Sequence, residues 1–430
     1  MKDGSSKAMK TTIKTLCGML AMLAFTACSS DNDERADAPR FYNVTLTASM
    51  GDAETRALSE GTGNVITATF AKNDEVVVVD ADGVTIVGTL RAQTAGASTT
   101  LSGDLNAASL TVGEKVTLRY RSATANYDGQ VGTLAGIADN QDYEEGTLTV
   151  STTNPLTFTS NSVTLLAKQS ITKFTFKNGT NPVSVKSFGI AAVGLVQSIA
   201  TNGIETAGAV TGTLGTAASD VYIALRNNTD AKQTYAFTIK DNAGNWYITT
   251  KKAKLTYGKN YAVDIALTPL PALTSSDAVG TIGVVDGLPA IVLNNTTAVA
   301  LMNTGALCPE AYGTYYTFAN LPSGDWYVPS KAELETLAGF SISWGAPYGV
   351  NGRTFTIGGN TLFLPAAGLD DGDNDPHDFL YVSEFGYYWS STPASDDALA
   401  ICLSFSSSAI NIISDYKIDG LTVRPFHALN

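Results

Sequence analysis

The residues before Cys28 indicate what chemistry this cysteine could undergo. The chain begins with a basic segment that contains Lys2, Lys7, Lys10 and Lys14. The next segment, residues 16–27 (LCGMLAMLAFTA), is uncharged and mostly apolar. As a helix it would measure about 18 Å, too short for a bilayer core of about 30 Å. This layout is typical of a secretory signal peptide, so residues 1–27 are expected to be removed.

The junction Ala27-Cys28 resembles a bacterial lipobox, in which the cysteine is acylated, for example with palmitate, and becomes the new N-terminus. The alternative is ordinary signal cleavage with Cys28 as a passenger. Residues 28–40 then form a lipidated acidic tether. Its first part resembles the export signal that carries Bacteroides-type lipoproteins to the outer leaflet, or is only a solvated charged run. The residues concerned are Ser29, Ser30, Asp31, Asp33 and Glu34.

The remaining cysteines are Cys308 and Cys402, and two interpretations fit them. An oxidising compartment allows a disulfide between them, and two buried free thiols are equally compatible with the sequence. His377 and His427 are the only histidines. Since no Cys/His spacing suits zinc and no nucleophile motif is found, we expect no catalytic residues, no zinc site and no enzymatic activity.

Two segments carry side chains that suit a ligand. One is the aromatic loop 344–349, where Trp344 and Tyr348 could stack on sugar rings or anchor a protein interface. Buried core aromatics would look similar in sequence. The other is the acidic segment 370–378, where Asp371 and Asp373 could accept sugar hydroxyls. This segment fits either an exposed acidic turn or a Ca²⁺ site, although no EF-hand register fits. The candidate calcium ligands are Asp370, Asp371, Asp373 and Asp375.

Composition favours β-structure outside the cell. The chain has 430 residues, a formal net charge of −13, only 16% charged residues and 39 glycines. Such length suggests two to three domains. An acidic chain repels phosphate backbones, so nucleic-acid binding is excluded.

Short strands with turn signals between them fill residues 41–270, and this pattern predicts β-sandwiches. We expect one sandwich over 41–150 and a second over 151–270, followed by a proline-rich linker at 271–278. Beyond the linker, Ser330–Gly339 predicts a helix with Ser330 as N-cap and Glu333 completing a capping box. The fold class is therefore mainly β, with an α+β domain over 279–430.

Residues 41–268 resemble the fimbrillin family, the pilins and pilin-like lipoproteins of type V pili. In that family an Arg-specific protease cuts at a Thr-Arg-Ala sequence, and a strand from the neighbouring subunit fills the emptied groove. Arg56 and Ala57 are the matching residues here, although Arg56 could equally be an ordinary loop arginine. The segments that carry the resemblance are 54–57 (ETRA), 71–78 (AKNDEVVV), 127–130 (YDGQ), 156–158 (LTF) and 221–225 (VYIAL).

Residues 279–430 resemble the Fibrobacter major paralogous domain, which is related to C-type-lectin-like and formylglycine-enzyme-like folds. The resemblance implies that Trp326 and Trp389 belong to the core, and by itself it names no ligand. Five ordered motifs carry it: 280–287 (GTIGVVDG), 326–334 (WYVPSKAEL), 363–368 (FLPAAG), 386–392 (GYYWSST) and 420–425 (GLTVRP).

These features together predict a surface-exposed, outer-membrane, adhesin-like lipoprotein, either a pilus tip or a minor pilin. Its expected partners are other pilus subunits, joined by donor-strand exchange, and a glycan or protein on a host or bacterial surface. Two alternatives stay open. One is a glycan-capture lipoprotein that never polymerises, and the other is a pilus anchor subunit without a ligand of its own.

Overall fold

A computed structural model of the chain describes residues 39–51, 59–60, 66–67, 69–120, 122–372 and 378–429. Nearly all regular structure in these ranges is β-strand, as the composition predicts. No helix in the described residues is long and apolar enough to cross a bilayer.

The first β-domain consists of residues 39–51, 69–120 and 144–167. Its eight strands form one sheet that closes on itself, because β9 pairs with β7 as well as with β11. In sheet order they are β10 (Leu156–Phe158), β9 (Glu144–Thr153), β11 (Ser162–Ala167), β1 (Phe41–Met50), β6 (Ser98–Asn106), β5 (Ile86–Ala92), β4 (Glu75–Val79) and β7 (Lys115–Tyr120). Alternating side chains of these strands fill a single apolar core.

The second β-domain consists of residues 122–143 and 168–270 and is a two-sheet sandwich. One sheet contains β13 (Asn181–Pro182), β12 (Ser170–Asn178), β18 (Asp220–Asn227), β15 (Leu195–Ile199), β16 (Glu205–Ala207), β21 (Asn260–Ala266) and β8 (Ala125–Asn126). The other contains β17 (Val210–Ala218), β14 (Val185–Ala191), β19 (Gln233–Asp241) and β20 (Trp246–Ala253). Rings from both sheets meet in the core: Phe174 and Phe237 lie 5.3 Å apart, edge to face.

The chain passes between these two domains more than once, and this corrects the expected boundary at residues 150 and 151. That position lies inside β9, and strands β10 and β11 still belong to the first β-domain. Conversely, β8 pairs with β15, and the short helix α1 (Leu134–Asn140) contacts β18 of the second β-domain. Strand patterning shows where strands occur, whereas pairing decides which domain each one joins.

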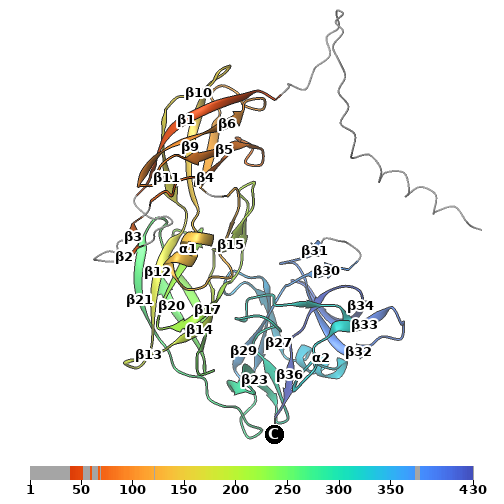
Figure 1. The fold of residues 1–430 in the computed structure, drawn as a ribbon. Helices are drawn as coiled ribbons and strands as arrows, with labels where there is room; N and C mark the ends of the chain where they lie inside the picture. Colours follow the sequence, from red (N-terminus) through yellow and green to blue (C-terminus); the bar gives the residue numbers. More distant parts are fainter. Residues whose placement is uncertain are drawn as a thin grey trace, which may run out of the picture. The chain divides into compact units, whose positions relative to one another are not determined.

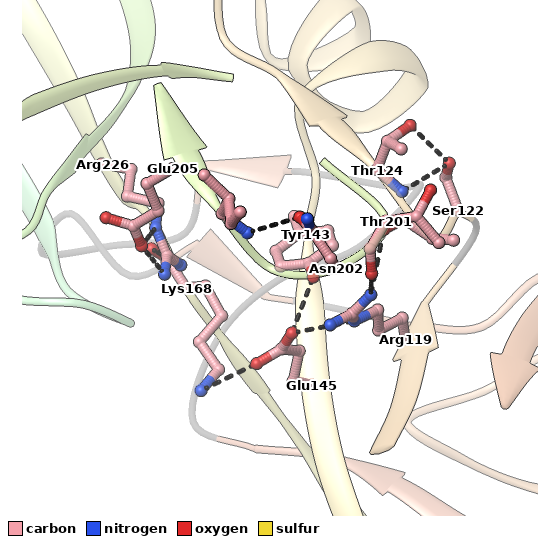
Figure 2. A network of polar contacts seen from close by, with 12 residues as sticks. Arg119, Ser122, Thr124, Tyr143, Glu145, Lys168, Thr201, Asn202, Glu205 and Arg226 are labelled. Carbon is pink, nitrogen blue, oxygen red and sulfur yellow. Dashed lines mark hydrogen bonds and ion pairs between the residues drawn. The ribbon is translucent and has the colours of Figure 1, made fainter. Parts of the chain in front are cut away.

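A polar network joins the two β-domains at this crossing (Figure 2). Glu145 of β9 accepts hydrogen bonds from Arg119 Nε at 3.1 Å and from the Tyr143 hydroxyl at 2.6 Å, and its second oxygen lies 3.3 Å from Lys168 Nζ. Arg119 also donates to the carbonyl of Thr201 in the second β-domain. Burial raises the pKa of Glu145, but these donors outweigh burial and hold it below its ordinary value. Glu145 is therefore ionised and links the first β-domain to Tyr143 and Lys168 of the second.

The C-terminal domain, residues 271–429, carries two larger sheets. One contains β22 (Ile282–Val285), β23 (Leu288–Asn294), β24 (Thr297–Ala300), β36 (Phe426–Ala428) and β26 (Trp326–Tyr327). The other contains β25 (Tyr315–Tyr316), β35 (Leu421–Thr422), β32 (Gly386–Pro393), β33 (Leu399–Phe405) and β34 (Ile410–Tyr416). Smaller elements are β27 (Ser341–Gly345), β28 (Gly352–Ile357), β29 (Asn360–Pro365), β30 (Leu369–Asp371), β31 (Asp378–Leu380) and the 3₁₀ turn η1 (Phe318–Asn320).

The predicted helix is confirmed as α2 (Lys331–Ala338). Ser330 accepts from the backbone of Glu333, and the Glu333 carboxylate accepts in return from Ser330, so the capping box is complete. Leu334 and Leu337 face the core.

The expected linker at 271–278 is packed against its neighbours rather than free. Leu273 is buried and pairs with Val284 through its backbone at 2.8 Å. Trp246 of the second β-domain packs into the C-terminal core, and its indole nitrogen donates to the carbonyl of Gly287 at 2.8 Å. Apolar burial and hydrogen bonding therefore fix a segment that proline content alone predicts to be a spacer.

Candidate functional site

The residues predicted to anchor and process the chain lie outside the described residues. These are Cys28, Ser29, Ser30, Asp31, Asp33, Glu34, Arg56 and Ala57. The structure does describe the preceding strand, β1, which ends at Met50, and it shows what a cut at Arg56 would separate from the rest of the chain.

Strand β1 lies between β6 and β11 in the closed sheet, with β6 alongside it in Figure 1. It pairs with β6 in antiparallel register from Phe41 opposite Asn106 to Ser49 opposite Ser98. On its other side it pairs with β11 in parallel. Both neighbours come from much later in the chain, so β1 has no hairpin partner.

Three alternate side chains of β1 reach the core of the first β-domain. Val44, Leu46 and Ala48 are at most 6% exposed, whereas the residues between them face solvent. Burying a valine or leucine contributes roughly 1.5–3 kcal/mol. Apolar side chains and a backbone ladder therefore hold β1 in the sheet, and a cut after Arg56 would leave it without a covalent link to the strands that follow.

The structure places the predicted ligand residues apart and gives most of them other roles. Trp344 lies in strand β27, not in a loop, and is half buried against the C-terminal core. The Arg353 guanidinium lies 5.8 Å from the centre of the Trp344 ring. Tyr348 packs against a small cluster formed by Ala191, Ala209 and Cys308, which corrects its assignment to an open aromatic face. Burial raises the pKa of the Tyr348 hydroxyl.

The acidic segment is described only at its ends. Asp370 is buried, and its backbone exchanges two hydrogen bonds of 2.8 Å with Gly420. Asp371 stands opposite Asp378 across the β30–β31 pair. Asp373 and Asp375 lie outside the described residues. Among the residues that are described, no group of three His, Cys, Asp or Glu side chains could hold a metal ion.

The structure decides between the two interpretations of the cysteines. Both thiols are free and buried, and they lie in different apolar clusters, so the disulfide alternative is corrected. Cys308 contacts β14: a Cβ on Gly189 would stand 2.5 Å from that of Cys308. Burial raises the pKa of both thiols, so they are protonated and unreactive at neutral pH.

The tryptophans assigned to the core differ from each other. Trp389 is fully buried, and its indole nitrogen donates to the carbonyl of Tyr316 at 2.7 Å, as its assignment to the core predicts. Trp326 is only half buried and packs on His427 with ring centres 5.0 Å apart.

A pocket of about 460 Å³ lies where the second β-domain meets the C-terminal domain. One wall carries the polar residues Asp128, Gln197 and Thr211, and the other carries Tyr315 and Phe379. None of these five was predicted to bind a ligand. Asp128 belongs to the 127–130 segment that carried the fimbrillin resemblance, so a sequence signal existed for that residue. The aromatic pair gave none, because its ring contact depends on the pairing of distant strands.

Behind this pocket, Glu310 is a buried carboxyl group beside Cys308. Burial raises the pKa of Glu310 to about 7, although its own backbone N–H, the Cys308 thiol and the charge of Arg424 act in the opposite direction. In the unfolded chain the same group has its ordinary pKa of 4.5. The folded state therefore binds the extra proton between these values, and stability falls as pH rises through this window.

We expect Glu310→Gln to remove this dependence. The wild-type free energy of unfolding should decline between about pH 4.5 and pH 7 relative to the variant, because only the wild type must take up a proton at residue 310 when it folds. Urea unfolding at several pH values measures the difference, with the exposed Glu335→Gln as control. Parallel curves for the wild type and Glu310→Gln would contradict the assignment.

Comparison with known proteins adds three findings. Residues 351–426 match a family described as a domain of unknown function, DUF8237. The search of curated proteins found no match. Several solved structures resemble the chain over about half of its length.

These solved structures are fimbrial and adhesion proteins. A fimbrial assembly protein from Parabacteroides distasonis is 14% identical with a TM-score of 0.27, covering 52% of this chain and 91% of its own. A candidate cell adhesion protein from Bacteroides ovatus is 14% identical with a TM-score of 0.31, covering 54% and 95%. The tip fimbrial protein Mfa3 from Porphyromonas gingivalis is 10% identical with a TM-score of 0.29, covering 54% and 96%.

Proposed function

We propose that this protein is a surface-anchored adhesive subunit associated with pili, held by a lipid on Cys28. The observation that carries the proposal is the placement of β1. This strand lies between β6 and β11 without a hairpin partner, and the Thr-Arg-Ala sequence at 55–57 comes after its end at Met50, beyond residues 51–54. A strand held in this way can be replaced by a strand of equal pattern from another subunit.

The C-terminal domain supplies the adhesive part of the proposal. Its sequence motifs resemble a C-type-lectin-like module, and it contributes the aromatic wall of the pocket described above. The two β-domains form the stalk or assembly module. Glu145 and its partners tie these β-domains to each other, which suits a subunit that carries load between an anchor and a ligand.

The anchor is tested by replacing Cys28. Cys28→Ala should abolish fatty-acid labelling and release the chain from membranes, because acylation supplies the membrane affinity. Labelling, membrane fractionation and the presence of the chain in sheared fibres are measured in the same cells. Membrane attachment that survives the change would contradict the lipid anchor.

A matched variant separates anchoring from display. Neutralising Asp31, Asp33 and Glu34 together should leave the chain bound to membranes but shielded from protease added to intact cells. Unchanged protease access would mean that this run is only a tether.

A further inference from the structure

The pocket between the second β-domain and the C-terminal domain has walls of contrasting chemistry. Its volume of about 460 Å³ is within the range of small-molecule sites. Among the described residues that line it, Asp128 is the only charged one. The described lining thus offers aromatic surface, hydroxyl and amide groups, and the carboxylate of Asp128.

The aromatic wall is built from Tyr315 and Phe379. Their ring centres lie 4.9 Å apart with planes tilted by 49°. The Tyr315 hydroxyl donates to the carbonyl of Ala367 at 2.5 Å, which fixes the orientation of that ring. Phe379 is 51% exposed and lines the pocket. A half-exposed aromatic ring held against a fixed partner is a stacking surface.

The segment that follows Phe379 adopts a costly backbone conformation. Tyr381 and Ser383 have φ angles of 58° and 68°, which side-chain-bearing residues rarely adopt. The Ser383 backbone is held on both sides, because its N–H donates to Ala366 O at 2.8 Å and its carbonyl accepts from the Asn351 side chain at 3.0 Å. Strain of about 1–3 kcal/mol per residue is characteristic of ligand-binding segments, whose geometry is fixed in advance.

Close packing also fixes residues 380–383 on the side of Gly368 and Tyr312. A Cβ on Gly368 would stand 2.1 Å from the carbonyl oxygen of Leu380, so only glycine fits there. The Tyr312 hydroxyl lies 3.2 Å from Ser383 Oγ. Close packing and hydrogen bonding therefore hold the segment that follows Phe379.

The opposite wall presents Asp128. Its Oδ1 accepts hydrogen bonds of 2.7 Å from both the backbone N–H and the hydroxyl of Thr211. Its Oδ2 lies 3.5 Å from the Gln197 amide nitrogen. A carboxylate has about four lone-pair sites, so Asp128 keeps capacity to accept hydroxyl donors from a ligand.

A neutral saccharide matches this combination of groups. Sugars present hydroxyls to carboxylate and amide groups and apolar C–H faces to aromatic rings. Anionic ligands are disfavoured by the carboxylate and by the net charge of −13. We propose that this pocket binds one neutral sugar unit of a glycan, with Phe379 stacking on the ring and Asp128 accepting hydroxyls. This inference rests on the proposed adhesive function and names its ligand class and site.

The test uses the purified mature chain and saturation-transfer NMR. The probes are galactose, glucose, mannose, fucose, N-acetylglucosamine and N-acetylgalactosamine, each tested alone, with sialic acid as the anionic counterpart. We expect at least one neutral sugar to bind and sialic acid not to bind. Phe379→Ala should weaken that binding about tenfold, and Thr314→Trp at the exposed rim should block it. Phe41→Ala, which removes an exposed phenylalanine of the first β-domain, should leave binding unchanged.

Each alternative outcome overturns the inference. Binding of none of the neutral sugars, or of sialic acid alone, would mean that the pocket is not a neutral-sugar site. Binding that survives both Phe379→Ala and Thr314→Trp would place the sugar elsewhere. Circular dichroism of each variant shows that it is folded. The inference and the proposed function fail separately, because sugar binding is measured on free protein and display is measured on cells.

Discussion

A chain that begins at Ala57 is expected to be strongly destabilised relative to one that begins at Pro39. The shorter chain lacks β1, so the core loses Val44, Leu46 and Ala48, and the facing edges of β6 and β11 lose their backbone partner. The apolar term alone is on the order of 5 kcal/mol. This is comparable with the total stability of many domains, about 5–15 kcal/mol.

A peptide with the sequence of residues 41–50 should restore the loss, because it carries the same alternation of buried and exposed side chains. Thermal unfolding of both chains, with and without this peptide, measures the effect. The control peptide carries Val44→Asp and Leu46→Asp, which keep the length but place charges in the core. Equal stability of the two chains, or equal rescue by both peptides, would contradict a replaceable β1.

The corresponding observation in cells is the N-terminus of the protein in sheared fibres. Donor-strand assembly predicts mature material that starts at Ala57. Fibre material that always starts at Cys28 would exclude removal of β1 and favour a subunit that keeps its first strand.

Arg424→Met is expected to cost about 3–5 kcal/mol of unfolding free energy, because it leaves buried hydrogen-bond acceptors unsatisfied. Arg424 is fully buried. Its guanidinium donates to Asn303 Oδ1 at 2.9 Å and to the carbonyls of Ala300 at 3.1 Å and Phe363 at 3.0 Å. Methionine keeps much of the apolar stem but leaves all three acceptors buried without this donor. Each acceptor that finds no other donor costs about 1–3 kcal/mol of stability.

Burial lowers the pKa of Arg424 to about 10, so the side chain still carries its charge at neutral pH. Urea unfolding at pH 7 measures the change in free energy. Arg424→Lys should also be strongly destabilised, because an ammonium group lacks the planar fork that reaches three acceptors. The exposed Lys252→Met should change stability by less than about 0.5 kcal/mol. A cost below about 1 kcal/mol for Arg424→Met would contradict the view that Arg424 stabilises the fold by joining Ala300, Asn303 and Phe363.

Local patterns predicted local structure well. The capping box at Ser330 and Glu333 placed α2, because the side-chain and backbone groups that make it lie within one turn. The short strands expected across residues 41–270 are present, among them β4, which is a run of four valines after Glu75. Trp389 was assigned to the core through its motif, and its complete burial agrees.

Misplaced residues share one cause. The sequence predicts one aromatic loop with Trp344 and Tyr348, but Trp344 belongs to strand β27 and Tyr348 packs on the second β-domain. Burial of an aromatic ring depends on what covers it, and here the cover comes from residues far away in the sequence. The boundary expected at residue 150 failed for the same reason, since strand pairing assigns β10 and β11 to the first β-domain.

The sequence by itself determined that the chain is mainly β and where the capped helix α2 begins, and it showed that Cys28 and Arg56 stand in sequences that resemble motifs for lipid attachment and cleavage. These features depend on neighbours along the chain. Only the tertiary structure decided that Cys308 and Cys402 are apart, that β1 has no hairpin partner, and that Asp128 shares a pocket with Phe379. Each of these depends on contacts between distant segments, which strand register and domain packing set and which local pattern does not encode.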